Sequence, residues 1–164
     1  MILRALTLAG GLAGAIAGSQ FPEYSQQYMQ RLGGAVDALG EVVADFDASA
    51  AAASLSREDA LVQMTGTAFL SRRGADMART FARYERLSTD FAILQGHGPF
   101  MRAYHAARFT DSDIARAAWQ AYQPAVPVNF AGLIFACFGF VTATLGVGLL
   151  VRLVAWPLRR VTAP

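Results

Sequence analysis

The residues able to do acid–base or metal chemistry are few and loosely spaced. His97 and His105 are eight positions apart, whereas two metal ligands on one helical face are typically about four apart. Asp111 and Asp113 follow without a nearby cysteine, and the single Cys137 falls in an apolar segment where a thiolate is disfavoured. No serine has the flanking glycines of a nucleophile elbow, and no glycine-rich turn follows a strand pattern. The sequence therefore predicts no catalytic residue, no metal site and no cofactor, with a hydrolase site around His97, His105 and Asp111 as the less favoured alternative.

The composition excludes further classes of protein. Only 16% of the 164 residues are charged, against roughly 25% in an average soluble domain, and the mean hydropathy is +0.33. A net charge of +2 without a basic cluster argues against a nucleic-acid partner. We expect an all-α membrane protein with two transmembrane helices flanking a helical extramembrane domain.

The C-terminal apolar segment predicts a transmembrane helix over residues 128–156. Residues 128–151 include no charge across 24 positions. Such a run forms about 36 Å of helix, enough for a hydrocarbon core of about 30 Å. Pro157 is expected to end this helix, which leaves residues 157–164 as a cytoplasmic tail.

The N-terminal span is expected at residues 1–21. Its uncharged part, residues 5–21, is at the short end of the spanning range. A cleaved signal peptide is the alternative, because Ala15 and Ala17 resemble a cleavage signature. A retained anchor is favoured, because glycines interrupt the apolar stretch and only Arg4 precedes it.

Charge placement predicts the orientation of both spans. All 12 acidic residues and ten of the 14 basic residues lie between the spans, and the other arginines flank the spans without acids beside them. The positive-inside rule then places both termini in the cytoplasm of a bacterium and residues 22–127 in the periplasm, with the inverted topology as the alternative. The predicted membrane-interface anchors are Arg4, Trp119, Tyr122, Arg152, Trp156, Arg159 and Arg160.

Residues 22–127 carry helical patterns throughout. A seam at alternating steps of four and three, from Tyr28 to Ser49 and mostly apolar, predicts a long helix over about 22–52. Ser56 before acidic residues predicts the start of a second, antiparallel long helix over about 57–95. Shorter helices are expected over about 100–108 and 112–122. The predicted seam residues are Leu32, Leu39, Phe46, Leu70, Met77, Phe81, Tyr84 and Phe91.

Glycines form a face on each predicted span. In the first span Gly10, Gly14 and Gly18 are four apart, and in the second Gly132, Gly139 and Gly146 are seven apart. Such faces let two helices approach closely in lipid. Two interpretations stay open: the spans pack on each other within one chain, or they contact other subunits.

An arginine stripe follows the second long helix. It comprises Arg72, Arg73, Arg79, Arg83 and Arg86. A solvated helix face is the simpler interpretation, and contact with an acidic partner or with anionic lipid headgroups is the functional one.

The stretch LAGGLAGAIAGSQFPEYSQQYMQRLGGAVDAL, continuing to VVADFDASAAAASLSREDAL, resembles an uncharacterised family of small proteobacterial inner-membrane proteins. The likeness is best over residues 3–62 and implies localisation and architecture, not a catalytic residue. Together with the glycine faces and heptad seams, it leads us to expect a non-enzymatic scaffold or accessory subunit. The expected partners are membrane lipid, further copies of the chain or subunits of a respiratory or photosynthetic complex. An envelope or lipid sensor is the first alternative, and a hydrolase or transporter component is the second.

Overall fold

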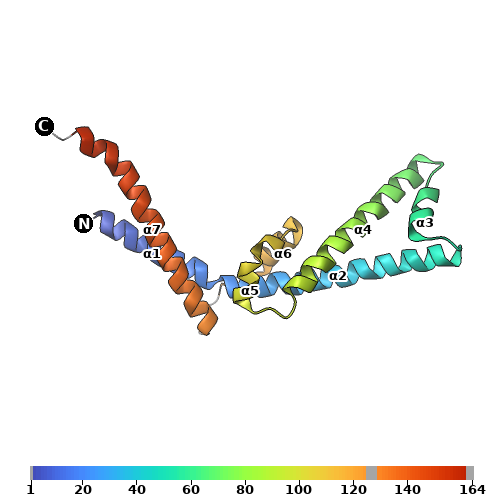
Figure 1. Ribbon diagram of the computed structural model, residues 1–164, viewed down its shortest axis with the longest axis horizontal. Coiled ribbons are helices and arrows are strands. Elements are labelled where there is room, and N and C mark those ends of the chain that lie inside the picture. Colours follow the sequence, from blue (N-terminus) through green and yellow to red (C-terminus); the bar gives the residue numbers. More distant parts are fainter. Residues whose placement is uncertain (1, 125–128, 162–164) are drawn as a thin grey trace. The chain divides into compact units, whose positions relative to one another are not determined.

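The computed structural model describes the backbone of residues 2–124 and 129–161 and the side chains of residues 3–124 and 129–154. Every regular element within this part of the chain is helical, which confirms the predicted all-α class (Figure 1). The elements are α1 (Ile2–Ser19), α2 (Phe21–Ala52), α3 (Arg57–Gln63), α4 (Ala68–Leu94), α5 (Pro99–Tyr104), the 3₁₀ turn η1 (Ala106–Arg108), α6 (Ser112–Ala121) and α7 (Phe130–Val161).

The chain forms two compact units. One unit comprises the residues up to Gln26 together with those from Ala121 onward, and its main elements are α1 and α7. The other unit comprises Gln27–Gln120 and holds most of α2 together with α3 to α6.

Helix α7 differs from its predicted form at its C-terminal end. It begins after Asn129, whose side-chain oxygen accepts a hydrogen bond from the Gly132 N–H at 2.7 Å. The expected start at Val128 lies outside the described residues. Pro157 does not end the helix as we expected, because α7 continues to Val161. A proline removes one backbone hydrogen bond and bends a helix, and an apolar helix tolerates this when the flanking turns stay bonded.

The buried face of α2 departs from the predicted heptad seam. Leu32 is fully buried, but the deep contacts further along are Val43 and Ala50, each 5% exposed, while Val42 is 41% exposed and Ser49 is exposed. The step from Leu32 to Val43 is eleven residues. A straight α-helix has 3.6 residues per turn, so a strict seven-residue repeat drifts around it by about 20° per heptad. The buried face of α2 is therefore shifted by one residue from the predicted seam, from Val42 to Val43 and from Ser49 to Ala50.

The helix predicted over 57–95 is two helices. Ser56 caps α3 as expected, accepting a hydrogen bond from the Asp59 N–H at 3.0 Å. The chain then turns at Gly66, which has a φ of +96°, and the Thr67 hydroxyl caps α4 by accepting from the Leu70 N–H at 3.2 Å. Glycine adopts positive φ without strain, so this turn is built into the sequence.

Helices α2 and α4 run in opposite directions, and α3 closes one end of this hairpin (Figure 1). The core there contains Val43 of α2 with Met77 and Phe81 of α4; the partly buried residues around it are Phe46, Leu61, Met64 and Tyr84. Arg57 fastens α3 by a salt bridge of 2.5 Å to Asp47, and its guanidinium lies 4.9 Å from the centre of the Phe81 ring. The ion pair lowers the pKa of the Asp47 carboxyl.

Candidate functional site

The closest helix contact in the first unit joins α1 to α7 through glycine. A Cβ built on Gly14 would overlap the backbone oxygen of Gly139, and a Cβ built on Gly139 would overlap that of Gly14. Gly18 continues the contact, because its Cβ would lie 2.5 Å from the Phe135 carbonyl oxygen. At Gly10 the neighbour is the Val147 side chain, 2.7 Å from the hypothetical Cβ. Only glycine permits this approach of two backbones.

The glycine stripe of α7 does not run as the seven-residue spacing suggests. The residues of α7 that meet Gly18, Gly14 and Gly10 are four apart; they are Phe135, Gly139, Ala143 and Val147. Gly11 meets the adjacent row, through Phe140 and Thr144. A seven-residue stripe through Gly139 leaves this row, and a Cβ on Gly146 would meet nothing within 4 Å. Gly132 is buried near the start of α7. Steps of four on both helices are typical of ridges-into-grooves packing and of right-handed glycine crossings, not of heptad seams.

Large apolar side chains cover the other faces of this helix pair. On α1 the exposed ones are Leu3, Leu6, Leu8, Leu12 and Ile16. Helix α7 exposes Phe138, Leu145 and Leu149 among many others. The segment Phe130–Val154 is long and apolar enough to cross a membrane, and none of its most apolar window is buried. Such an unburied apolar surface is typical of contact with lipid or with another protein.

The predicted interface anchors occupy different settings. Arg4 of α1 and Arg152 of α7 line one groove between these helices. The Tyr122 hydroxyl donates a hydrogen bond to the Gln20 side chain, which ties the chain after α6 to the end of α1. Trp119 is 67% exposed on α6. Trp156, Arg159 and Arg160 lie beyond the residues whose side chains the structure describes.

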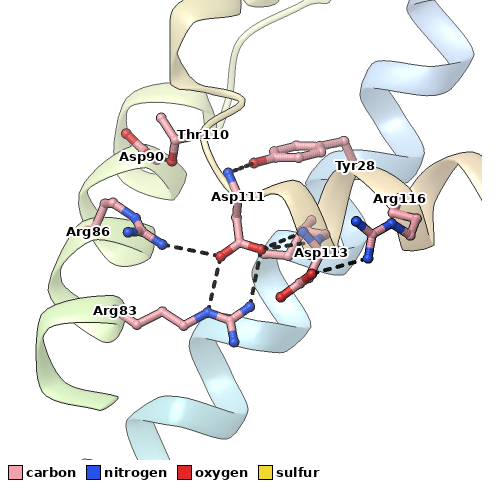
Figure 2. A network of polar contacts seen from close by, with 9 residues as sticks. Tyr28, Arg83, Arg86, Asp90, Thr110, Asp111, Asp113 and Arg116 are labelled. Atoms are coloured by element: carbon pink, nitrogen blue, oxygen red, sulfur yellow. Dashed lines mark hydrogen bonds and ion pairs between the residues drawn. The ribbon is translucent and has the colours of Figure 1, made fainter. Parts of the chain in front are cut away.

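An arginine–aspartate cluster in the second unit is centred on Asp111 (Figure 2). The Asp111 carboxylate is 6% exposed and accepts two hydrogen bonds of 3.1 Å from Arg83 and one of 3.3 Å from Arg86. It also caps α6, accepting from the backbone N–H groups of Asp113 and Ile114 at 3.2 and 3.1 Å. The cluster therefore fixes the start of α6 against α4.

Three further contacts extend this cluster. The Asp111 N–H donates to the hydroxyl of fully buried Tyr28 at 3.4 Å, so α2 joins the same network. On α4, buried Asp90 accepts from the Thr110 hydroxyl at 2.7 Å and lies 3.5 Å from an Arg108 nitrogen. The sequence pattern alone does not show that a later segment returns to cover Asp90.

The arginine stripe is thus divided by its contacts. Arg83 and Arg86 bind Asp111 within the chain, so they do not form the free stripe that the sequence suggests. Arg79 forms an exposed ion pair with Asp76. Arg72 and Arg73 are exposed and form no ion pair within the described part of the chain.

Burial by itself would raise the pKa of the Asp111 carboxyl. The hydrogen bonds from the Ile114 N–H and from Arg83 outweigh burial and hold the pKa below the ordinary value of 3.8. An ionised carboxylate that already accepts hydrogen bonds from two arginines and two N–H groups is a poor general base. These contacts give no support to a hydrolase site that uses Asp111.

His97 and His105 lie closer together than their spacing suggests. Their rings are stacked with centroids 5.6 Å apart and planes at 11°, and the Tyr104 ring contacts His105 edge-on. The chain brings them together because Gly96, with a φ of +78°, turns it sharply before α5. No group of three or more metal-ligating side chains occurs among the residues that were described.

The closed end of the hairpin exposes apolar side chains that sequence reasoning missed. Phe69 is 75% exposed and Val62 is 73% exposed, on either side of the turn between α3 and α4. Leu70 is also exposed, at 38%, although it belongs to the predicted seam. The sequence offers no clear signal for this exposure, because adjacent positions of a helix can both belong to one broad apolar face. The remaining α4 seam residues are buried or partly buried; they are Met77, Phe81, Tyr84 and Phe91.

A family model described as a protein of unknown function (DUF2937) matches residues 2–160. The chain belongs to this family. The DUF2937 match spans both units, so it extends far beyond residues 3–62, where the sequence resemblance is best. No curated protein and no solved structure matches the chain. Because the description of the DUF2937 family names no activity, the functional argument rests on the geometry given above.

Proposed function

We propose that the chain is a two-span bacterial inner-membrane protein that acts as a non-enzymatic scaffold or accessory subunit. In this proposal α1 and α7 span the membrane with both termini in the cytoplasm, and the Gln27–Gln120 unit lies in the periplasm. The exposed leucines of α1 and its close packing on α7 support a shared membrane location. Helix α7 contacts α1 and the Phe21 ring within its unit, and these contacts leave the outer apolar faces of both helices exposed.

The observation that carries the assembly role is the exposed apolar end of the hairpin. We call Val62, Phe69 and Leu70 the hairpin tip. Contiguous exposed apolar patches often mark interaction sites, and these three exposed side chains lie around one turn at the end of the hairpin. Aromatic residues of this kind are the usual anchors of protein interfaces. We propose that another protein subunit covers the hairpin tip.

The α1–α7 glycine contact supports the hairpin tip as the partner surface, because the α1 glycine face was the alternative. The α1 glycines already pack against α7 of the same chain, so a partner would need a different surface. The hairpin tip is such a surface, and it belongs to the extramembrane part of the proposed topology. Self-association and association with another complex both remain compatible with it.

The test is the mass of the protein as extracted from its membrane. The full chain with a C-terminal tag would be purified in mild detergent and measured by native mass spectrometry, with identification of the co-purifying chains. We expect either a fixed multiple of 17.5 kDa or a fixed ratio to other membrane subunits. Phe69→Ser should reduce this association, because it removes the largest exposed side chain of the tip.

Tyr104→Ser is the matched control. Tyr104 is 80% exposed on α5, so this variant also removes an exposed aromatic ring but leaves the hairpin tip intact. Association lost equally in both variants would point to general destabilisation. A monomer in the unmodified protein, free of partner chains, would contradict the proposed role.

A second candidate function is the recognition of anionic lipid headgroups. It is favoured by Arg72 and Arg73, which are exposed beside the hairpin tip and form no ion pair within the described residues. Paired Arg72→Gln and Arg73→Gln substitutions should then abolish a salt-sensitive binding of the protein to added anionic vesicles. Binding that survives this change, or that is insensitive to salt, would contradict the second candidate.

A further inference from the structure

A groove opens between α1 and α7 on one side of their glycine contact. Its wall is largely apolar, with Leu3 and Leu8 from α1 and Phe140 and Gly148 from α7. The groove has a volume of about 920 Å³. Known small-molecule sites have volumes of roughly 300–1,000 Å³, so the groove is large enough for a ligand.

The groove exists because the α7 wall is small at Gly148. A Cβ built on Gly148 would meet nothing within 4 Å, whereas a Cβ on Gly10 meets Val147 at 2.7 Å. The Thr7 hydroxyl donates to the Leu3 carbonyl of its own helix at 2.9 Å, so its hydrogen-bonding capacity is met within α1. The Thr144 hydroxyl also lines the groove, and within the described residues it is buried without a hydrogen-bond partner. The rest of the lining between the two arginines is apolar and suited to a hydrocarbon chain.

Two arginines line the same groove, one from each helix. Arg4 and Arg152 form no ion pair with any residue whose side chain is described. Both lie beside the uncharged stretches, which places them at the level of the lipid headgroups when α1 and α7 span the membrane. A guanidinium binds phosphate through paired hydrogen bonds. Two guanidinium groups beside an apolar wall favour a ligand that is anionic at one end and apolar at the other.

We propose that this groove is a binding site for an anionic phospholipid. One acyl chain would lie along Leu8, Phe140 and Gly148, and the phosphate would contact Arg4 and Arg152. The inference rests on the proposed two-span topology, because only then does the groove open to lipid. Free phosphate would leave the apolar wall unused, and a zwitterionic lipid would leave part of the positive charge unpaired.

The experiment is native mass spectrometry of the full chain in mild detergent. Dioleoyl phosphatidylglycerol or dioleoyl phosphatidylcholine would be added in equal amounts, and the lipid molecules retained per protein chain would be counted. We expect one phosphatidylglycerol to be retained in preference to phosphatidylcholine. Combined Arg4→Gln and Arg152→Gln substitutions should reduce the preference by about tenfold or more, since each arginine near a headgroup contributes about 1 kcal/mol.

Gly148→Leu tests the apolar part of the site, because Gly148 lines the groove and a Cβ there would meet nothing within 4 Å. This variant should lose the retained lipid. Gly146→Leu is its control: a Cβ at Gly146 also meets open space, but Gly146 does not line the groove. It should retain the lipid as the unmodified protein does.

Three results would overturn the site. They are equal retention of the two lipids, unchanged retention in Gly148→Leu, and displacement of the lipid by inorganic phosphate alone. Labelling of single cysteines near each terminus in intact cells separates this failure from failure of the topology. Termini that are labelled from the periplasm would contradict the proposed topology itself, whereas protected termini without specific lipid would contradict only the site.

Discussion

Gly14 and Gly139 lie backbone against backbone, and a Cβ on either residue would overlap the main chain of the other. This pair is the tightest part of the α1–α7 contact. Rows of residues four apart lead away from it on both helices, through Gly10 and Gly18 on α1 and through Phe135 and Ala143 on α7. The pair therefore sets how the two helices cross.

The first prediction concerns this crossing. Gly14→Leu should lower the free energy of unfolding of the helix pair by about 1–3 kcal/mol, because a larger residue forces the backbones apart. Unfolding in mixed micelles, followed by circular dichroism, would measure it. Gly146→Leu adds the same side chain at an open position and should be neutral. Equal effects of the two changes would contradict the packing described here.

The second prediction concerns the Asp111 cluster. Asp111→Asn keeps the shape of the side chain but removes the charge that binds Arg83 and Arg86. The free energy of unfolding should fall by about 1.5–3 kcal/mol, as for hydrogen bonds to a charged group. Denaturant titration of the full chain would measure this. Asp113→Asn is the control, since its ion pair with Arg116 is exposed and should contribute less than about 1 kcal/mol.

The third prediction is a pH dependence of stability from the same carboxylate. The pKa of Asp111 is lower in the folded chain than its ordinary value of 3.8. Its contribution to stability is therefore complete above that ordinary value and is lost as the pH falls through the lower, folded pKa. Stability should decline as the pH is lowered below 3.8. The decline should be shallower in Asp111→Asn; an identical pH profile in both proteins would exclude Asp111 as its source.

The fourth prediction tests the turn between α3 and α4. Gly66→Ala should destabilise the chain by about 1–2 kcal/mol, because Gly66 has a φ of +96° and alanine is strained there. Gly34→Ala is the opposite control, since Gly34 lies inside α2 with nothing within 4 Å of a Cβ. It should stabilise by about 0.5–1 kcal/mol. Thermal unfolding of both variants distinguishes the two signs, and a shared sign would contradict the backbone argument.

Local signals in the sequence anticipated much of the helix order. The Ser56 cap and the long apolar segment before Val151 were readable because each depends on neighbouring residues alone. The division at Gly66 and Thr67 was also encoded locally, but the heptad spacing from Leu70 onward favoured one continuous helix. Pro157 led to the opposite error, a predicted helix end where the helix continues, because a proline can bend a helix without ending it.

Contacts between distant segments could not be read in the same way. The ion pair between Arg83 and Asp111 joins residues 28 positions apart, and nothing in the arginine stripe indicates which members find an internal acid. The exposure of Phe69 likewise depends on where the chain turns between α3 and α4. Seven-residue glycine spacing suggested Gly146 as a contact, whereas the helix crossing uses steps of four through Gly139.

The most direct test of the assembly role is a cross-link from the hairpin tip in living cells. A photoactivatable phenylalanine analogue would be incorporated at position 69 of the full chain, and at position 104 for comparison. Illumination should link position 69 to a second copy of the chain or to another defined membrane subunit, in a yield well above that from position 104. No defined product from position 69, or equal yields from both positions, would contradict the claim that a subunit covers the hairpin tip.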